Sequence, residues 1–119
     1  MKLIVAIIRP ERLEAVQTAL QRVLDEDDNY RMTVDPVQGH GRQHGEIEYF
    51  RGQVVLPRMV AKTRITIAVN DKYVEAAVGA IIEGARTENG GDVGDGKIFV
   101  TTLEECVRIR TGERGPSAI

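Results

Sequence analysis

The glycine-rich stretch GGDVGDGKIFV, residues 90–100, has the composition of a loop that binds phosphate. Glycine permits positive φ angles, so successive backbone N–H groups in such a loop can point toward one anion. The spacing from Gly91 to Lys97 matches most of a P-loop, but that motif needs a Ser or Thr after the lysine and then a helix. Ile98 and a β-branched run follow instead, so we exclude a P-loop. The alternative is a hairpin turn with a solvated lysine.

Two further clusters have residues suited to phosphate chemistry. In RIRTGERG, Arg108 and Arg110 are two positions apart, so in an extended chain both would point to one face and could grip a polyphosphate. In GHGRQHG, Gln43 lies on a glycine-hinged loop, where amide and backbone oxygens could complete a Mg²⁺ shell. Each cluster alone could be solvated surface, since exposed arginine pairs contribute below about 1 kcal/mol. Together with Lys97 they favour an anion site.

Composition narrows the class of protein. The chain has 119 residues and a formal net charge of −2, with both signs mixed along it, so we expect one domain and no nucleic-acid partner. No apolar run approaches the roughly 20 residues of a membrane span, and the first residues do not resemble a signal peptide, so we expect a cytoplasmic protein that is not embedded in a membrane. The single cysteine, Cys106, is interpreted as a small packed residue.

Hydrophobic periodicity predicts six elements in the order β-α-β-β-α-β. The predicted strands are 2–9, 32–38, 63–69 and 97–102. Pro10 is placed to open the first helix, Pro36 suggests an edge strand or a bulge, and Asn70 is expected to cap the second helix. A short helical turn is expected over 103–107. This order is typical of the ferredoxin-like α+β sandwich, an antiparallel four-stranded sheet with two helices on one face.

The two predicted helices each have one apolar face. The residues expected on these faces are Leu13, Val16, Leu20, Val23 and Leu24 in the first helix and Val74, Ala77, Val78, Ile81 and Ile82 in the second. The other face of the sheet would then need a second subunit to cover it, which predicts a homo-oligomer. Residues 39–62 are too long a connection for a small domain, so we interpret them as a functional loop, with a disordered insertion as the alternative.

Four segments together resemble the P-II nitrogen-regulatory signal-transduction proteins, over essentially the whole chain. They are AIIRPERLEAV, GHGRQHG, RTENGGDVGDGKIFV and VRIRTGERGPSAI. The resemblance implies a single domain, 1–119, that forms a homotrimer with a cleft between each pair of subunits. It also implies that ATP and ADP compete for each cleft, and that the protein is a sensor rather than an enzyme. In this numbering the T-loop, which docks on targets, would be 39–62, the B-loop 86–97 and the C-terminal loop 108–119.

The same resemblance implies roles for individual residues. The nucleotide-binding set would be Ile7, Thr33, Gly39, Gly41, Arg42, Gln43, Arg86, Thr87, Gly94, Asp95, Gly96, Lys97, Arg108 and Arg110. The two arginines near the C-terminus would reach in from the neighbouring subunit. Gln43 would help hold Mg²⁺ on the ATP phosphates and, with Lys62, the effector 2-oxoglutarate. Arg51 would contact the target, for which an ammonium transporter is a candidate, so that the protein would be recruited to a membrane channel.

The chain departs from the family pattern at several positions. Val55 occupies the position of the tyrosine that many members have for uridylylation, and Gln53 that of a serine phosphorylated in some. We therefore expect regulation by ligands without such a covalent switch. His44 replaces a lysine that usually follows the glutamine, which makes the charge there pH-dependent. The B-loop segment ENGGDV is also longer than in relatives.

These departures leave alternatives open. One is a P-II-like sensor of another small anion, such as bicarbonate with ADP, or a regulator of nitrogenase. A second is an unrelated ferredoxin-like interaction module that binds no small ligand. A metal-binding trimer is a third, but His40 and His44 lie on a glycine-broken loop, which disfavours them as a ligand pair.

Overall fold

The computed structural model describes residues 1–24, 30–41, 49–50, 53–54 and 58–119. Its strands are β1 (Lys2–Ile8), β2 (Met32–Gly39), β3 (Tyr49–Phe50), β4 (Gln53–Val54), β5 (Val60–Val69) and β6 (Gly96–Thr102). Its α-helices are α1 (Leu13–Val23) and α2 (Val74–Ala85), and short 3-10 turns cover Pro10–Arg12, Asp71–Tyr73 and Pro116–Ala118.

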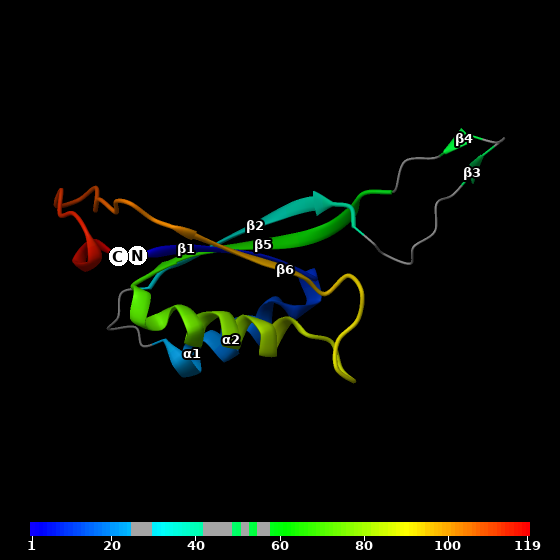
Figure 1. Cartoon of the computed structure of the whole chain (residues 1–119), viewed down its shortest axis with the longest axis horizontal. Coiled ribbons are helices and arrows are strands. Elements are labelled where there is room, and N and C mark those ends of the chain that lie inside the picture. The colour runs from blue at the N-terminus through cyan, green and yellow to red at the C-terminus, as the bar shows by residue number, and fades with distance from the viewer. Residues whose placement is uncertain (25–29, 42–48, 51–52, 55–57) are drawn as a thin grey trace.

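Four strands form one antiparallel sheet in the order β2-β5-β1-β6 (Figure 1). Both helices lie on the same side of it, so the ferredoxin-like βαββαβ fold is confirmed. Pro36 lies in β2, at an edge of the sheet, where the missing N–H breaks no ladder on its outer side. The two short strands β3 and β4 pair with each other, away from the main sheet.

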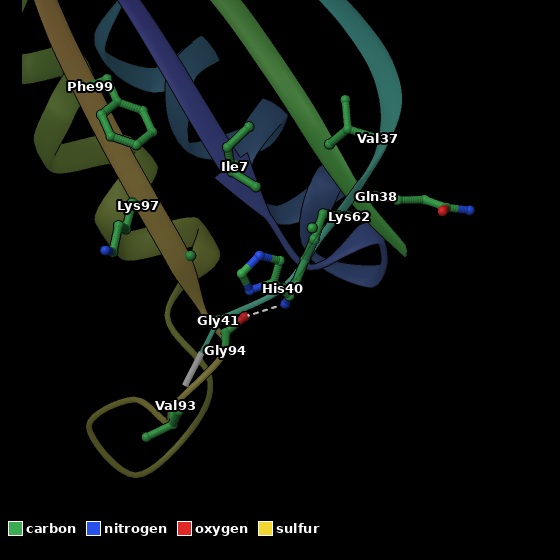
Figure 2. Close-up of a pocket in the computed structure, with 12 residues that line it drawn as sticks. Ile7, Val37, Gln38, His40, Gly41, Lys62, Val93, Gly94, Lys97 and Phe99 are labelled. Atoms are coloured by element: carbon green, nitrogen blue, oxygen red, sulfur yellow. Dashed lines mark hydrogen bonds between the residues drawn. The ribbon is translucent and has the colours of Figure 1, made fainter. Parts of the chain in front are cut away.

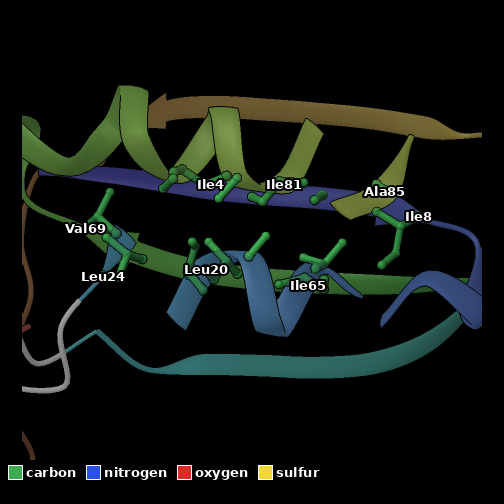
Figure 3. Packing of buried hydrophobic residues seen from close by; sticks show 14 residues of the cluster. Ile4, Ile8, Leu20, Leu24, Ile65, Val69, Ile81 and Ala85 are labelled. Atoms are coloured by element: carbon green, nitrogen blue, oxygen red, sulfur yellow. The ribbon is translucent and has the colours of Figure 1, made fainter. Parts of the chain in front are cut away.

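The core lies between the sheet and the helices (Figure 3). Alternation along β1 directs Ile4, Ala6 and Ile8 toward the helices, where all three are buried. Residues of α1 and α2, such as Leu20 and Ile81, pack against them from the helix side. The other residues of β1, such as Ile7, therefore point to the open face, the side of the sheet that no helix covers.

The two helices approach each other closely at Gly84. A Cβ atom at this position would lie 2.6 Å from Cα of Val16, inside the backbone of α1. Val23 and Ile82 were predicted to be buried, and that prediction is wrong: they are 42% and 40% exposed. Val23 precedes the buried Leu24, and Ile82 follows the buried Ile81. Successive helical residues are rotated by about 100°, so both side chains lie at the rim of the packed face.

Two local predictions near the C-terminal half are also wrong. Residues 103–107 form no helical turn; instead Val107 pairs with Arg114 in an isolated antiparallel bridge. Asn70 precedes the Asp71–Tyr73 turn, but its side chain makes no capping bond. Its Nδ2 donates to the carbonyl oxygen of Pro116 at 3.2 Å instead, because the C-terminal segment folds back against this end of the sheet.

Candidate functional site

A cavity of about 860 Å³ lies on the open face, at the end of the sheet where β6 begins (Figure 2). Its lining comes from β1, β2, β5, β6 and the loops that follow β2 and precede β6. The lining residues are Ile7, Val37, Gln38, Gly39, His40, Gly41, Lys62, Val93, Gly94, Gly96, Lys97 and Phe99. Seven of them belong to the predicted site: Ile7, Gly39, Gly41, Lys62, Gly94, Gly96 and Lys97.

Strand register explains why these residues converge. Ile7 is directly opposite Lys97 on β6, and Lys62 of β5 is opposite Val37 of β2. Because side chains alternate along each strand, directly opposed residues share a face. Burial, and then the nearby Arg9, lower the pKa of Lys62. A bound anion would offset both of these causes.

The loop between α2 and β6 is shaped by positive φ angles. Asn89 has φ +64°, and the two glycines after it have +87° and +97°. Gly96, with φ +118°, has no room for a side chain, because a Cβ atom there would overlap the carbonyl oxygen of Ile7. The glycines are thus required by backbone conformation and, at Gly96, also by the close approach of β1.

The carboxylate of Asp95 holds this loop together. Its Oδ2 accepts hydrogen bonds from Thr87 N at 3.0 Å, Thr87 Oγ1 at 3.2 Å and Asp92 N at 2.9 Å, and its Oδ1 accepts from Arg9 Nε at 3.1 Å. Desolvation by burial raises the pKa of Asp95, but the hydrogen bonds from Asp92, Thr87 and Arg9 together outweigh it, so the pKa falls from 3.8 to about 2. Asp95 is therefore ionised at neutral pH.

Two cationic side chains, Arg9 just after β1 and Lys62 in β5, donate to carbonyl groups of the same loop. Arg9 Nη2 donates to the carbonyl oxygen of Val93 at 2.9 Å, and Lys62 Nζ donates to that of Gly94 at 2.7 Å (Figure 2). Arg9 was not among the predicted site residues. The sequence signal that could have identified Arg9 was its position: it directly follows Ile8, which pairs with Gly96 of the glycine-rich loop.

Arg108 and Arg110 are not brought to this cavity. β6 runs from Gly96, opposite Ile8, to Thr102, opposite Lys2, so the segment that follows it lies at the far end of the sheet (Figure 1). Arg108 donates to Glu113 Oε2 at 2.8 Å and to the carbonyl oxygen of Ser117 at 3.1 Å. Residues 109–111 form a turn, so the extended chain that would place both arginines on one face is not present.

Of the remaining predicted residues, some are described by the structure and some are not. Thr33 is exposed on β2 opposite Thr66 and does not line the cavity. Arg86 lines a smaller cavity of about 190 Å³, together with Asp95 and Lys97. Five residues lie outside the described residues: Arg42, Gln43, His44, Arg51 and Val55. Within the described ranges, no three His, Cys, Asp or Glu side chains gather as a metal site.

Comparison with known proteins gives the family. The model of the family described as nitrogen regulatory protein P-II matches residues 1–113. The chain belongs to the P-II family. A P-II 2 protein of Methanothermobacter thermautotrophicus is 48% identical over 119 residues, covering 100% of this chain and 97% of the relative. The nitrogen regulatory protein GlnK1 of Methanosarcina mazei is 45% identical with the same coverage, and the P-II protein of Bradyrhizobium diazoefficiens is 44% identical over the full length of both chains.

As a P-II protein, the chain is a nitrogen regulatory protein. The matched region includes the cavity, the glycine-rich loop and both C-terminal arginines, so it contains every residue of the predicted site. None of the helices in the described ranges has the length and apolar character that crossing a membrane requires.

Proposed function

We propose that this P-II chain is a signal transducer that binds ATP or ADP in the open-face cavity and reports the bound ligand to target proteins through residues 39–62. One observation carries the proposal: Lys97, Lys62 and the positive-φ glycine loop converge on one cavity. The described residues that line it include no Asp or Glu. Such a site favours a polyanion, because ammonium groups and backbone N–H groups bind phosphate oxygens and no carboxylate repels them.

The cavity also has an apolar part suited to a nucleoside. Ile7, Val37 and Phe99 supply apolar surface beside the cationic groups, and Phe99 is 52% exposed in the single chain. Ligand sites commonly combine apolar walls with a few placed polar groups. Membership of the P-II family supports the same choice, since ATP and ADP are ligands of that family.

We propose a homotrimer in which Arg108 and Arg110 of one subunit complete the phosphate site of the next. Both arginines lie at the end of the sheet opposite the cavity of their own chain. A cleft between subunits would join the two ends without unfolding either. The open face, with apolar residues such as Val5 and Phe99, is the surface that such an assembly would cover.

We propose that Mg²⁺ enters with ATP and that 2-oxoglutarate binds only beside it. The described lining has no carboxylate, so it fits a metal held chiefly by phosphate oxygens, as Mg²⁺ commonly is, with Gln43 as a further oxygen ligand. When bound, the metal would offset the repulsion between the triphosphate and the divalent 2-oxoglutarate. Lys62 would then pair with a carboxylate of 2-oxoglutarate.

Signalling would follow from differential binding. Ligands that favour different conformations of residues 39–62 shift which conformation is populated, and a target that binds one conformation detects the mixture. An ammonium transporter, contacted through Arg51, is the proposed target, with nitrogenase regulation as the alternative. Regulation would need no uridylylation, and the protein would act in the cytoplasm.

Calorimetric titration tests the ligand assignments. ATP, ADP and 2-oxoglutarate are titrated separately, and 2-oxoglutarate is titrated again with Mg²⁺–ATP present. We expect both nucleotides to bind, and 2-oxoglutarate to bind only in the last titration. If nucleotide binds but 2-oxoglutarate never does, the assignment of 2-oxoglutarate fails, and bicarbonate with ADP is the alternative to titrate next.

A lysine variant tests the site itself. Lys97→Ala should weaken nucleotide binding by about 1.5–3 kcal/mol, as expected for a charge-assisted contact. Lys2→Ala is the matched control, because Lys2 lies on the same sheet at its far end, where its Nζ donates to Thr102 Oγ1 at 3.2 Å. Equal effects of the two substitutions would show that the cavity is not the nucleotide site.

A further inference from the structure

The Asp95 carboxylate has little capacity left for a ligand. It accepts four hydrogen bonds from within the chain, three at Oδ2 and one at Oδ1. A carboxylate offers about four lone-pair directions, two on each oxygen, so the bonds occupy Oδ2 fully and one direction of Oδ1. The side chain is 18% exposed. Its surroundings are those of an internal structural group rather than of a group that waits for phosphate or metal.

The four bonds reach across the whole glycine-rich loop. The donors Thr87 and Asp92 lie eight and three residues before Asp95. Between them, Asn89, Gly90 and Gly91 have consecutive positive φ angles, a conformation that backbone preference alone does not select. The only other described backbone bonds within this span are Gly91 N to Thr87 O at 3.1 Å and Asp95 N to Asp92 O at 3.2 Å. Asp95 is thus the centre of the bonds that define the loop.

Arg9 connects this loop to the sheet. It follows Ile8, whose partner on β6 is Gly96, so its backbone position is set by the β1–β6 ladder. Its side chain is 22% exposed and binds both Asp95 Oδ1 and the carbonyl oxygen of Val93. The C=O and N–H of a trans peptide point in opposite directions, so holding the Val93 carbonyl also fixes the direction of the Gly94 N–H. Arg9, held by Asp95, therefore fixes the orientation of the N–H of Gly94, a residue of the cavity lining.

We propose that Asp95 and Arg9 are positioning residues: their ion pair holds the loop from Thr87 to Gly96 in its phosphate-binding shape, and neither side chain contacts the nucleotide or its metal. This inference rests on the proposed function, because it concerns the same cavity. It replaces the role of direct nucleotide contact that the family resemblance implied for Asp95.

The test is a double-mutant cycle read with and without metal. Asp95→Asn, Arg9→Gln and the double variant are titrated with ATP and ADP, once with Mg²⁺ and once with EDTA. Each single substitution should weaken binding by about tenfold or more, as expected when a charge-assisted contact is lost. The loss should be equal with Mg²⁺ and with EDTA, and the double variant should bind no worse than the weaker single variant, because both remove the same ion pair.

Three results would overturn the inference. A loss seen only with Mg²⁺ would make Asp95 a metal ligand, and losses that multiply in the double variant would make the two side chains independent contacts. Unchanged affinity in Asp95→Asn would show that the bonds do not position the loop. If Asp95→Asn does not fold, Arg9→Lys decides: it keeps the charge but cannot bind Asp95 and Val93 as a planar fork, so positioning predicts a smaller loss that is again independent of metal.

Two controls separate this inference from the proposed function. Glu83→Gln removes one negative charge from an exposed ion pair on α2, with Arg22 at 3.6 Å, and should leave affinity unchanged. If the unmodified protein binds neither nucleotide, the proposed function fails and the inference falls with it. If it binds nucleotide, and Lys97→Ala weakens that binding while Asp95→Asn does not, the inference alone fails.

Discussion

At one end of the main sheet Lys62 and Lys97 face a cavity, whereas at the other end Arg108 is bound by its own chain. The first end is built from four strands whose register brings residues distant in sequence onto one face. The second end is a single segment that folds back on itself through the bridge of Val107 and Arg114. Lys97 and Arg108, for which the family resemblance implies the same nucleotide-binding role, thus differ: Lys97 faces a cavity, and Arg108 is bound by its own chain.

Under the proposed function, this difference means that one chain supplies only part of the phosphate site. Lys97 can act where the chain places it, because the cavity is already formed. In the proposed trimer, Arg108 would first exchange its bonds to Glu113 and Ser117 and would then act in the cavity of another copy. The four predictions below test the two ends, beginning with the largest expected effect.

The most damaging substitution should be Gly96→Ala, at the cavity end. The alanine Cβ would overlap the carbonyl oxygen of Ile7, and the alanine would have to adopt φ +118°, which is strained for a residue with a side chain. We therefore expect a loss of about 3 kcal/mol or more in unfolding free energy. Gly90→Ala is the matched control: φ is +87° there, but nothing lies within 4 Å, so only about 1 kcal/mol is expected. Urea unfolding measures both. Equal losses would mean that the approach of β1 has no role.

A mixing experiment joins the two ends. Lys97→Ala and Arg108→Ala should each cost about 1.5–3 kcal/mol of nucleotide binding. If the two groups meet across a subunit boundary, unfolding and refolding the two variants together restores about one site in four to full affinity, because random assembly pairs intact partners that often. Calorimetric stoichiometry counts the restored sites. If no high-affinity sites appear, either both groups act within the same chain or Arg108 does not contribute to the nucleotide site.

The stability supplied by Asp95 should depend on pH. Its pKa is lowered in the folded protein, from 3.8 to about 2, so its stabilising effect is complete above about pH 4 and is lost as the pH falls through about 2. The shift corresponds to about 2 kcal/mol. We expect the unfolding free energies of the unmodified protein and Asp95→Asn to differ by about this amount at pH 6 and to converge as the pH falls from about 4 toward 2. Urea titrations across this range measure it, and a constant difference would contradict the assignment.

The smallest effect is expected at the far end. Glu113 binds Arg108, so under the proposed function it would compete with phosphate for this side chain; Glu113 is 40% and Arg108 is 32% exposed. Glu113→Gln should therefore change stability by less than about 1 kcal/mol. It should also tighten nucleotide binding slightly, by up to about threefold, since the competing charge is gone. Weaker binding in this variant would mean that Glu113 positions Arg108 for its ligand.

Predictions of the fold from the sequence succeeded where a hydrophobic pattern repeated over many residues. Strand alternation and helical spacing gave the element order. Of the edge strand or bulge that Pro36 suggested, the structure shows the edge strand. The predictions failed where one bond or contact decides the conformation, as at 103–107 and at Asn70, whose amide binds Pro116. The glycine-rich stretch pointed to Lys97, and the family resemblance added Ile7 and Lys62; sheet register explains why the three meet.

By itself, the sequence determined the βαββαβ order, the glycine-rich loop and the identity of its cations, because these follow from local periodicity and from residue type. The tertiary structure alone decided that Arg9 and Asp95 pair and that Arg108 lies away from the cavity. The family resemblance implied a nucleotide contact for Asp95, since a free carboxylate and one with four internal donors look the same in a sequence. Only the folding of distant segments against one another brings those donors to the carboxylate. Those contacts then decide the charge of a side chain and whether it can still bind a ligand.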